Sequence, residues 1–204
     1  MSFKKIHPIL KENIARIGIT APTAFQKEVI SKIKGGSSLF AIAPQGDGKT
    51  TAMIIATIQK LGAVAFEDSP RALIYVKDKQ SALELAEKFK EYTYGTDLRV
   101  YCAYEEHNIE LQREEIYLGT DIVIATPKRL SRIFYLNGIH LGQLKLFMVE
   151  DAAFLVKASD YSDVIRIPES IEKCQYIIFG EKFDNRMEKM RDSFMYNAET
   201  ITAE

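Results

Sequence analysis

The sequence predicts an α/β domain in which a parallel β-sheet carries helices on both faces. Short apolar runs alternate with longer amphipathic segments along the chain, which is typical of buried parallel strands joined by helices. A glycine-containing loop joins the first apolar run to a helix-forming segment. The 204 residues, of which 47% are hydrophobic, provide enough core material for one large domain.

The first part of the chain is predicted to form two helices. Apolar side chains recur close to helical spacing over residues 3–17, and Gly18 would end that helix. Thr20 or Thr23 can cap a second helix, which runs toward Gly35. By themselves these segments predict an ordinary helical hairpin.

Downstream, apolar runs and helices alternate. The runs predicted as strands are residues 39–43, 72–76, 98–103, 121–125, 146–149 and 176–179. The predicted helices are a segment that begins near residue 49, followed by residues 81–92, 108–118, 129–136 and 183–195. Because ligands of parallel sheets bind at the carboxyl ends of the strands, the polar residues that follow these runs are candidates for a site.

The loop at residues 43–50, A-P-Q-G-D-G-K-T, has the chemistry of a phosphate-binding loop. Gly46 and Gly48 can adopt backbone angles that turn successive N–H groups toward an anion. The helix that begins near Lys49 adds unsatisfied N–H groups and the positive end of its dipole. The Lys49 ammonium would reach the β- and γ-phosphates, and the Thr50 hydroxyl would bind Mg²⁺.

The alternative interpretation is a glycine turn that merely precedes a helix. The strict phosphate-loop pattern has glycine at the position of Ala43. The strand, the loop and the helix nevertheless follow one another in the required order. This context favours phosphate binding.

Charge and cysteine content exclude several classes of protein. The formal net charge of -1 gives no global basic field, so any nucleic-acid site must be a local patch. Cys102 and Cys174 stand far apart without metal or redox spacing, and we interpret both as buried structural thiols of a reducing compartment. We find no signal peptide and no apolar run of membrane-spanning length. We therefore expect a cytoplasmic protein without a membrane partner.

Basic residues gather after two predicted strands. Lys77 and Lys79 follow one strand, and Lys128 and Arg129 follow another, so they can form a local patch for nucleic-acid phosphates. The alternative is that these lysines form a solvated rim. The adjacent pair at residues 105–106, both glutamates, would oppose binding if it lies beside the patch.

Several stretches together resemble the first RecA-like domain of DEAD-box RNA helicases, over nearly the whole chain. Residues 18–26, G-I-T-A-P-T-A-F-Q, are similar to the Q motif of that family. Residues 43–50 are similar to its phosphate loop, and residues 125–130, A-T-P-K-R-L, resemble a segment that contacts the RNA backbone. The resemblance implies one RecA-like domain of the P-loop NTPase class over residues 1–204. It divides into a Q-motif helical segment at residues 1–36 and a P-loop α/β core at residues 37–204.

The resemblance also implies roles for individual residues. Gln26 would read the adenine, and Phe3 would pack on the base. The implied ATP-binding residues are Phe3, Gln26, Gln45, Gly46, Asp47, Gly48, Lys49 and Thr50. The implied RNA-binding residues are Lys77, Lys79, Thr126, Lys128 and Arg129. Thr50 and Glu150 would hold Mg²⁺, and the catalytic pair would be Glu150 and Asp151.

The sequence departs from the family pattern at several of these places. Residues 150–153 read E-D-A-A where the family has D-E-A-D, so each catalytic carboxylate is displaced by one methylene. Residues 77–82 read K-D-K-Q-S-A in place of P-T-R-E-L-A, and residues 180–182 read G-E-K in place of S-A-T. Glu105 and Glu106 replace a glycine pair. In an alternative interpretation, Glu150 and Asp151 merely cap the next helix.

From these features we expect an ATP-binding, DEAD-box-helicase-like domain with weak or absent hydrolysis and no strand separation on its own. Single-stranded RNA is a candidate second ligand. The main alternative is a non-catalytic protein-interaction module that retains the fold. A third interpretation is an active ATPase completed in trans by another polypeptide, such as a second RecA-like domain with its arginine fingers.

Overall fold

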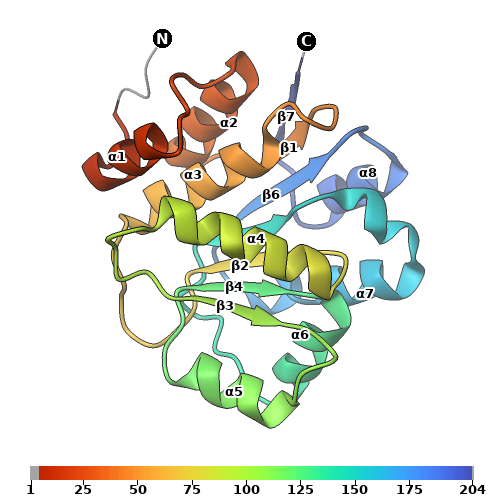
Figure 1. The fold of residues 1–204 in the computed structure, drawn as a ribbon. Coiled ribbons are helices and arrows are strands. Elements are labelled where there is room, and N and C mark those ends of the chain that lie inside the picture. Colours follow the sequence, from red (N-terminus) through yellow and green to blue (C-terminus); the bar gives the residue numbers. More distant parts are fainter. Residues whose placement is uncertain (1–4, 204) are drawn as a thin grey trace.

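The computed structural model describes residues 5–203 and confirms the predicted α/β fold (Figure 1). A seven-stranded sheet crosses this part of the chain in the order β3-β4-β2-β5-β6-β1-β7, and neighbouring strands run parallel. The strands are β1 (Leu39–Ile42), β2 (Ala72–Tyr75), β3 (Val100–Ala103), β4 (Ile122–Ala125), β5 (Leu146–Val149), β6 (Gln175–Gly180) and β7 (Glu199–Thr202).

Helices cover both faces of the sheet. The α-helices are α1 (Pro8–Arg16), α2 (Ala24–Gly35), α3 (Lys49–Leu61), α4 (Lys79–Tyr92), α5 (Ile109–Tyr117), α6 (Pro127–Tyr135), α7 (Ala158–Arg166) and α8 (Asn185–Ser193). Two short 3-10 helices, η1 (Ala152–Val156) and η2 (Pro168–Ser170), follow β5 and α7. Figure 1 shows α1 to α4 on one side of the sheet and α5 to α8 on the other.

The core is split into two layers by the sheet. Along β1, Leu39 and Ala41 pack with the layer of α1 to α4, whereas Phe40 and Ile42 pack with the layer of α5 to α8. Successive side chains of a strand point to opposite faces, and here both faces are covered. This explains why the strands are continuous apolar runs in the sequence.

Helix caps determine where α2 and α4 begin. Thr23 accepts a hydrogen bond from the backbone N–H of Gln26, while the Gln26 side chain accepts one from the N–H of Thr23. This capping box begins α2 after Thr23 and not after Thr20. Asp78 caps α4 through the N–H of Ser81, so that helix begins at Lys79, earlier than predicted.

One α-helix and one strand, α7 and β7, are absent from the prediction. β7 is an edge strand that pairs only with β1 within the described residues, and Ile201 is its one buried residue. A single buried side chain gives no periodic signal. α7 buries only Val164, so its apolar pattern is equally short.

A buried carboxylate forms hydrogen bonds with residues at the starts of neighbouring strands. Asp121, which precedes β4, accepts hydrogen bonds from the Arg71 side chain (2.6 Å) before β2 and the Arg99 side chain (2.9 Å) before β3. Asp121 is fully buried, and Arg71 is only 2% exposed. Backbone N–H groups of Phe66 and Arg99 also donate to Asp121. The Asp121 carboxylate therefore accepts four hydrogen bonds, which offset the cost of burying its charge.

The two cysteines are free thiols, and both are half-buried where the sequence predicted buried thiols. Burial raises the pKa of Cys102 to about 11 and the pKa of Cys174 to about 12. Both are thus protonated and unreactive near neutral pH. Among residues 5–203, no helix has the length and apolar character that crossing a membrane requires.

Candidate functional site

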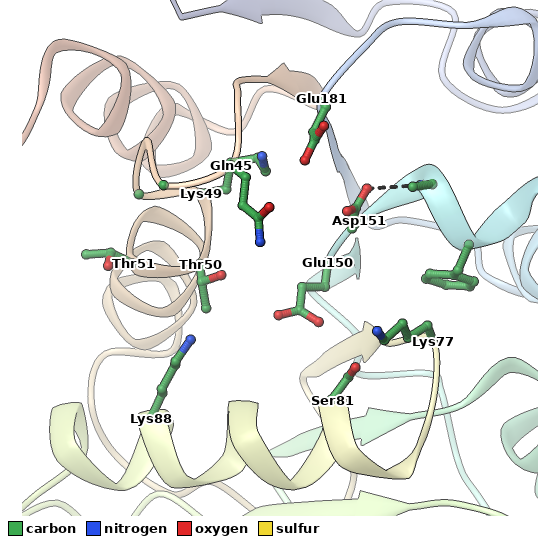
Figure 2. Close-up of a pocket in the computed structure, with 14 residues that line it drawn as sticks. Gln45, Lys49, Thr50, Thr51, Lys77, Ser81, Lys88, Glu150, Asp151 and Glu181 are labelled. Atoms are coloured by element: carbon green, nitrogen blue, oxygen red, sulfur yellow. Dashed lines mark hydrogen bonds between the residues drawn. The ribbon is translucent and has the colours of Figure 1, made fainter.

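A cleft of about 760 Å³ opens at the carboxyl ends of β1, β2, β5 and β6 (Figure 2). It is lined by Gln45, Gly46, Gly48, Lys49, Thr50, Thr51, Lys77, Ser81, Lys88, Glu150, Asp151, Ala153, Phe154 and Glu181. The glycine loop after β1 forms one wall. The segments after β5 and β6 face it, and α4 forms a further side.

The glycines of the loop have conformations that other residues rarely adopt. Gly46 has φ +95° and Gly48 has φ +84°, both in the left-handed region. A Cβ added to Gly48 would lie 2.1 Å from the Gln26 side-chain nitrogen. Helix α3 begins directly after Gly48, which makes no side-chain cap, so its first N–H groups remain available beside the cleft.

Ala43 marks the departure from the strict loop pattern, and the structure gives a reason for it. Its N–H donates to the carbonyl of Gly180 at 3.0 Å, so position 43 continues the pairing of β1 with β6. Ala43 is not among the described residues with positive φ. The conformational freedom of glycine is therefore not needed here.

Lys49 folds back over the loop. Its ammonium donates to the carbonyls of Ala43 at 2.5 Å and Pro44 at 2.9 Å. These two bonds hold the ammonium close to the loop backbone. Thr50, one residue later, presents its side chain to the cleft (Figure 2).

The two carboxylates after β5 behave differently. Asp151 accepts a hydrogen bond from the N–H of Ala153 at 2.9 Å and caps η1, as the helix-capping interpretation predicts. Glu150 makes no such cap, and its carboxylate points into the cleft (Figure 2). Burial raises the pKa of Glu150 to about 7, while the Lys88 ammonium opposes the shift. The raised pKa marks Glu150 as a functional candidate.

Thr50 and Glu150 have the chemistry that Mg²⁺ requires. Both offer oxygen ligands and both line the cleft. Mg²⁺ commonly takes one or two protein oxygens and completes its shell with phosphate oxygens and water. Within residues 5–203 no group of three or more His, Cys, Asp or Glu side chains is placed to hold a metal by itself. The residues present therefore fit a nucleotide-bound Mg²⁺ and not an all-protein metal site.

Among the described residues, two predicted nucleotide residues, Gln26 and Asp47, do not line the cleft. Phe3 lies outside the described residues. Gln26 is buried, and its amide nitrogen donates to the Gly48 carbonyl at 3.3 Å, so it contacts the loop from behind. Asp47 lines a smaller cavity of about 400 Å³ with the start of α2 and the end of β7.

The predicted RNA-binding residues are only partly exposed. Thr126 and Arg129 are buried. The Thr126 hydroxyl donates to the Glu105 carboxylate at 2.6 Å. Arg129 donates to the backbone carbonyl of Glu105 and to that of His107 at 3.1 Å. The groups that would meet RNA at this point are therefore bonded to the loop after β3.

The predicted lysines remain on the surface. Lys128 is exposed at the start of α6. The Lys79 ammonium lies 5.3 Å from the centre of the Tyr104 ring, in a cation–π contact. Lys77 lines the cleft itself, so the structure places it with the nucleotide candidates.

Six lining residues were not among the predicted site residues, namely Thr51, Ser81, Lys88, Ala153, Phe154 and Glu181. Ser81 and Lys88 are seven residues apart on α4, so they lie on one helix face two turns apart. That spacing was present in the sequence. It did not show which face of α4 would meet the loop.

Comparison with known proteins gives a consistent picture. The DEAD/DEAH box helicase family model matches residues 23–180. The ATP-dependent RNA helicase DeaD of Mycobacterium tuberculosis is 26% identical over 200 residues, which cover 97% of this chain and 35% of the relative. The ATP-dependent RNA helicase DBP10 of Gibberella zeae is 32% identical over 143 residues, covering 70% of this chain and 16% of the relative.

Among solved structures, a DEAD box protein from the hyperthermophile Methanococcus jannaschii has the same fold. It aligns with a TM-score of 0.91 at 21% identity. The alignment covers 100% of this chain and 56% of that protein. The chain thus spans about a third of the length of the DeaD relative and about half of the solved structure.

Proposed function

Because the chain belongs to the DEAD/DEAH box helicase family, we propose that residues 1–204 form a RecA-like domain that binds ATP with Mg²⁺. Residues 1–36 supply the Q-motif helices, and residues 37–204 supply the P-loop core. Hydrolysis of ATP is weak or absent, and the chain does not separate strands on its own. Single-stranded RNA is bound weakly.

One observation carries this proposal. The glycine loop, the open start of α3 and the carboxylates after β5 line a single cleft. Donors for phosphate and oxygen ligands for a divalent cation are thus brought together from segments about 100 residues apart. A chance glycine turn would not require this convergence.

The loop and its neighbours would hold the triphosphate. Backbone N–H groups of Gly46 and Gly48 and the start of α3 donate to phosphate oxygens. The Lys49 ammonium exchanges its carbonyl partners for phosphate. Thr50 and Glu150 hold Mg²⁺, which neutralises charge on the phosphates when it is bound.

Gln26 is proposed to select adenine. Its amide oxygen already accepts from the N–H of Thr23, and its nitrogen already donates to Gly48. An amide offers two acceptor positions and two donor hydrogens, so one of each remains for a base edge. The contact with Gly48 also couples base recognition to the phosphate loop. Phe3 is proposed as the aromatic that packs on the base.

Weak hydrolysis follows from the residues after β5 and β6. Asp151 is one methylene shorter than the glutamate of the family pattern, and its carboxylate is held by the N–H of Ala153. Misplacement of a catalytic group by about 1 Å can reduce the rate about 100-fold. In the family motif a polar link joins the ends of these two strands. Ala153, after β5, has no polar side-chain atom, and residues 180–182 at the end of β6 have no hydroxyl, so this link is lost.

Weak RNA binding follows from the face formed after β3 and β4. Lys79 and Lys128 are exposed there, and Lys77 is close by in the cleft. Thr126 and Arg129 are bonded to the Glu105 loop. We therefore expect RNA to contact the lysines without sequence preference.

A second candidate function is an interaction module. Large apolar side chains are exposed at the ends of α5 and α6, including Tyr117 (84%) and Leu118 (73%). Arg113, in the middle of α5, donates to the Leu136 carbonyl after α6, so this part of α5 contacts the end of α6. A protein partner or a second RecA-like domain in trans could use this surface.

Nucleotide titration separates the two functions. The 204-residue chain should bind MgATP, and Lys49→Ala should weaken that binding strongly because the loop loses its cation. Calorimetry or a fluorescent ATP analogue measures both. If the unmodified chain binds no nucleotide at millimolar concentration, the ATP-binding proposal is wrong and the interaction module is favoured.

A further inference from the structure

Six charged side chains line the cleft, three of each sign. The cations are Lys49, Lys77 and Lys88, and the anions are Glu150, Asp151 and Glu181. They come from the loop, the ends of β2, β5 and β6, and the middle of α4. The cation on α4, Lys88, has no part in the function described so far.

Lys88 reaches the cleft from the side opposite the loop. Figure 2 shows its ammonium pointing from α4 toward Thr50, with the Glu150 carboxylate in the same space. Among the described residues no carboxylate lies within 4.0 Å of this ammonium as an ion-pair partner. Lys88 is thus near the candidate metal ligands without being paired to them.

The backbone of α4 fixes this placement. Leu85 and Phe89, on either side of Lys88, are buried in the core below the helix. Asp78 caps the start of α4. The packing of these neighbours therefore fixes the face of α4 on which Lys88 lies.

Lys49 and Lys88 reach the cleft from opposite sides. Lys49 is held at the loop by the carbonyls of Ala43 and Pro44. Thr50 and Glu150, the proposed Mg²⁺ ligands, lie on the side of the cleft that Lys88 faces (Figure 2). Because Mg²⁺ bridges the β- and γ-phosphates of a nucleotide, the terminal phosphate would lie on this side, toward α4.

We infer that Lys88 contacts the terminal phosphate of the nucleotide and gives the site a preference for ATP over ADP. This inference rests on the proposed function. The ammonium would supply one charge-assisted hydrogen bond that ADP has no phosphate to accept.

The test is calorimetric titration of the 204-residue chain with MgATP and with MgADP. Lys88→Ala should weaken ATP binding about 10- to 100-fold, the range expected for one hydrogen bond to a charged group. ADP affinity should change less than about twofold, and Lys88→Arg should recover most of the loss. The matched control is Lys90→Ala. Lys90 lies two residues on, pairs with Glu87 and does not line the cleft.

The outcomes separate this inference from the proposed function. Equal losses of ATP and ADP affinity in Lys88→Ala, or no loss, would overturn the role of Lys88 while ATP binding itself stands. The same variant is repeated in a Glu150→Gln background. If the effect of Lys88 disappears there, it acts only through Glu150, and the direct phosphate contact is wrong. If the unmodified chain binds neither nucleotide, the proposed function fails as well.

Discussion

The hydroxyl of Thr126 donates a hydrogen bond of 2.6 Å to the carboxylate of Glu105. The backbone carbonyl of the same glutamate accepts from Arg129. One residue of the loop after β3 thus engages two of the three predicted RNA-binding residues of the segment after β4, Thr126 and Arg129. A carboxylate is held where a phosphate oxygen would need to bind, and the two anions would repel each other.

We therefore predict that Glu105→Gln strengthens binding of single-stranded RNA. The glutamine can still accept from Thr126, so the loop is kept while the negative charge is removed. Relief of one close charge repulsion of about 1 kcal/mol in water corresponds to about fivefold in affinity. Fluorescence anisotropy with an unstructured RNA measures the affinity of each variant.

The matched control is Glu106→Gln, which makes the same charge change on an exposed neighbour. Glu106 does not bond Thr126, so its variant should produce the smaller effect. In Glu105→Gln, the dependence of log affinity on log salt should steepen by about 0.7 for each additional RNA phosphate that the protein neutralises. Equal effects of the two variants would show that the bond to Thr126 does not matter.

Base preference provides the second prediction. Gln26→Ala should bring the affinities for ATP and GTP close together, because the remaining donor and acceptor of the amide are lost. Removal of the contact with Gly48 should also weaken both nucleotides modestly. Competition titrations measure the ratio. An unmodified chain that binds ATP and GTP equally would contradict adenine recognition by Gln26.

Hydrolysis provides the third prediction. With saturating MgATP and RNA the unmodified chain should turn over far more slowly than about 1 s⁻¹, the lower range of ordinary kinases. The cause is the displaced pair at positions 150 and 151, with Asp151 held as the cap of η1. A coupled assay for released phosphate measures the rate, with Lys49→Ala as the blank. Turnover near 1 s⁻¹ would make Glu150 and Asp151 a working catalytic pair.

A triple variant extends this test. Glu150→Asp, Asp151→Glu and Ala153→Asp restore the family order of carboxylates. We expect little gain from the chain alone and a larger gain when a second RecA-like domain is added in trans. An arginine supplied by another domain is typically worth about 10³ to 10⁵ in rate. A large gain from the triple variant alone would locate the whole defect in these three residues.

The fourth prediction concerns stability. Asp121→Asn should lower the free energy of unfolding by about 3–5 kcal/mol, because it leaves the charge of Arg71 buried with an incomplete partner. Urea denaturation at pH 7 measures the loss. The control Asp97→Asn removes an exposed carboxylate that accepts one bond from the N–H of Ala65, and it should cost about 1 kcal/mol or less.

The same pair predicts a pH dependence. Burial pushes the pKa of Asp121 upward, but hydrogen bonds from Arg99 and Arg71 outweigh it, and the net pKa is lowered. A lowered pKa gives stability that is present above the unfolded value of about 3.9 and is lost as the pH falls through the folded value. The difference in free energy of unfolding between the unmodified chain and Asp121→Asn should therefore be constant from pH 7 to about pH 5 and should shrink below about pH 4. A difference that shrinks with rising pH would contradict a lowered pKa of Asp121.

Local pattern determined much of this molecule. The apolar runs located the six strands from β1 to β6, and the glycine loop located the start of α3 within one residue. The cap at Thr23 was among the candidates because it acts only three residues along the chain. These features depend on neighbours within about one helical turn or one strand, so the order of residue types is enough to predict them.

Tertiary structure decided the rest of the site. Gln26 meets Gly48 across 22 residues, Glu105 meets Thr126 across 21, and β7 finds its place only by pairing with β1. Lys88 lines the cleft because α4 packs on the core through another face, which carries Leu85 and Phe89. Such contacts depend on how twisted strands and packed helices orient distant segments in space. No local periodicity encodes that orientation, because it is fixed by the packing of the whole core.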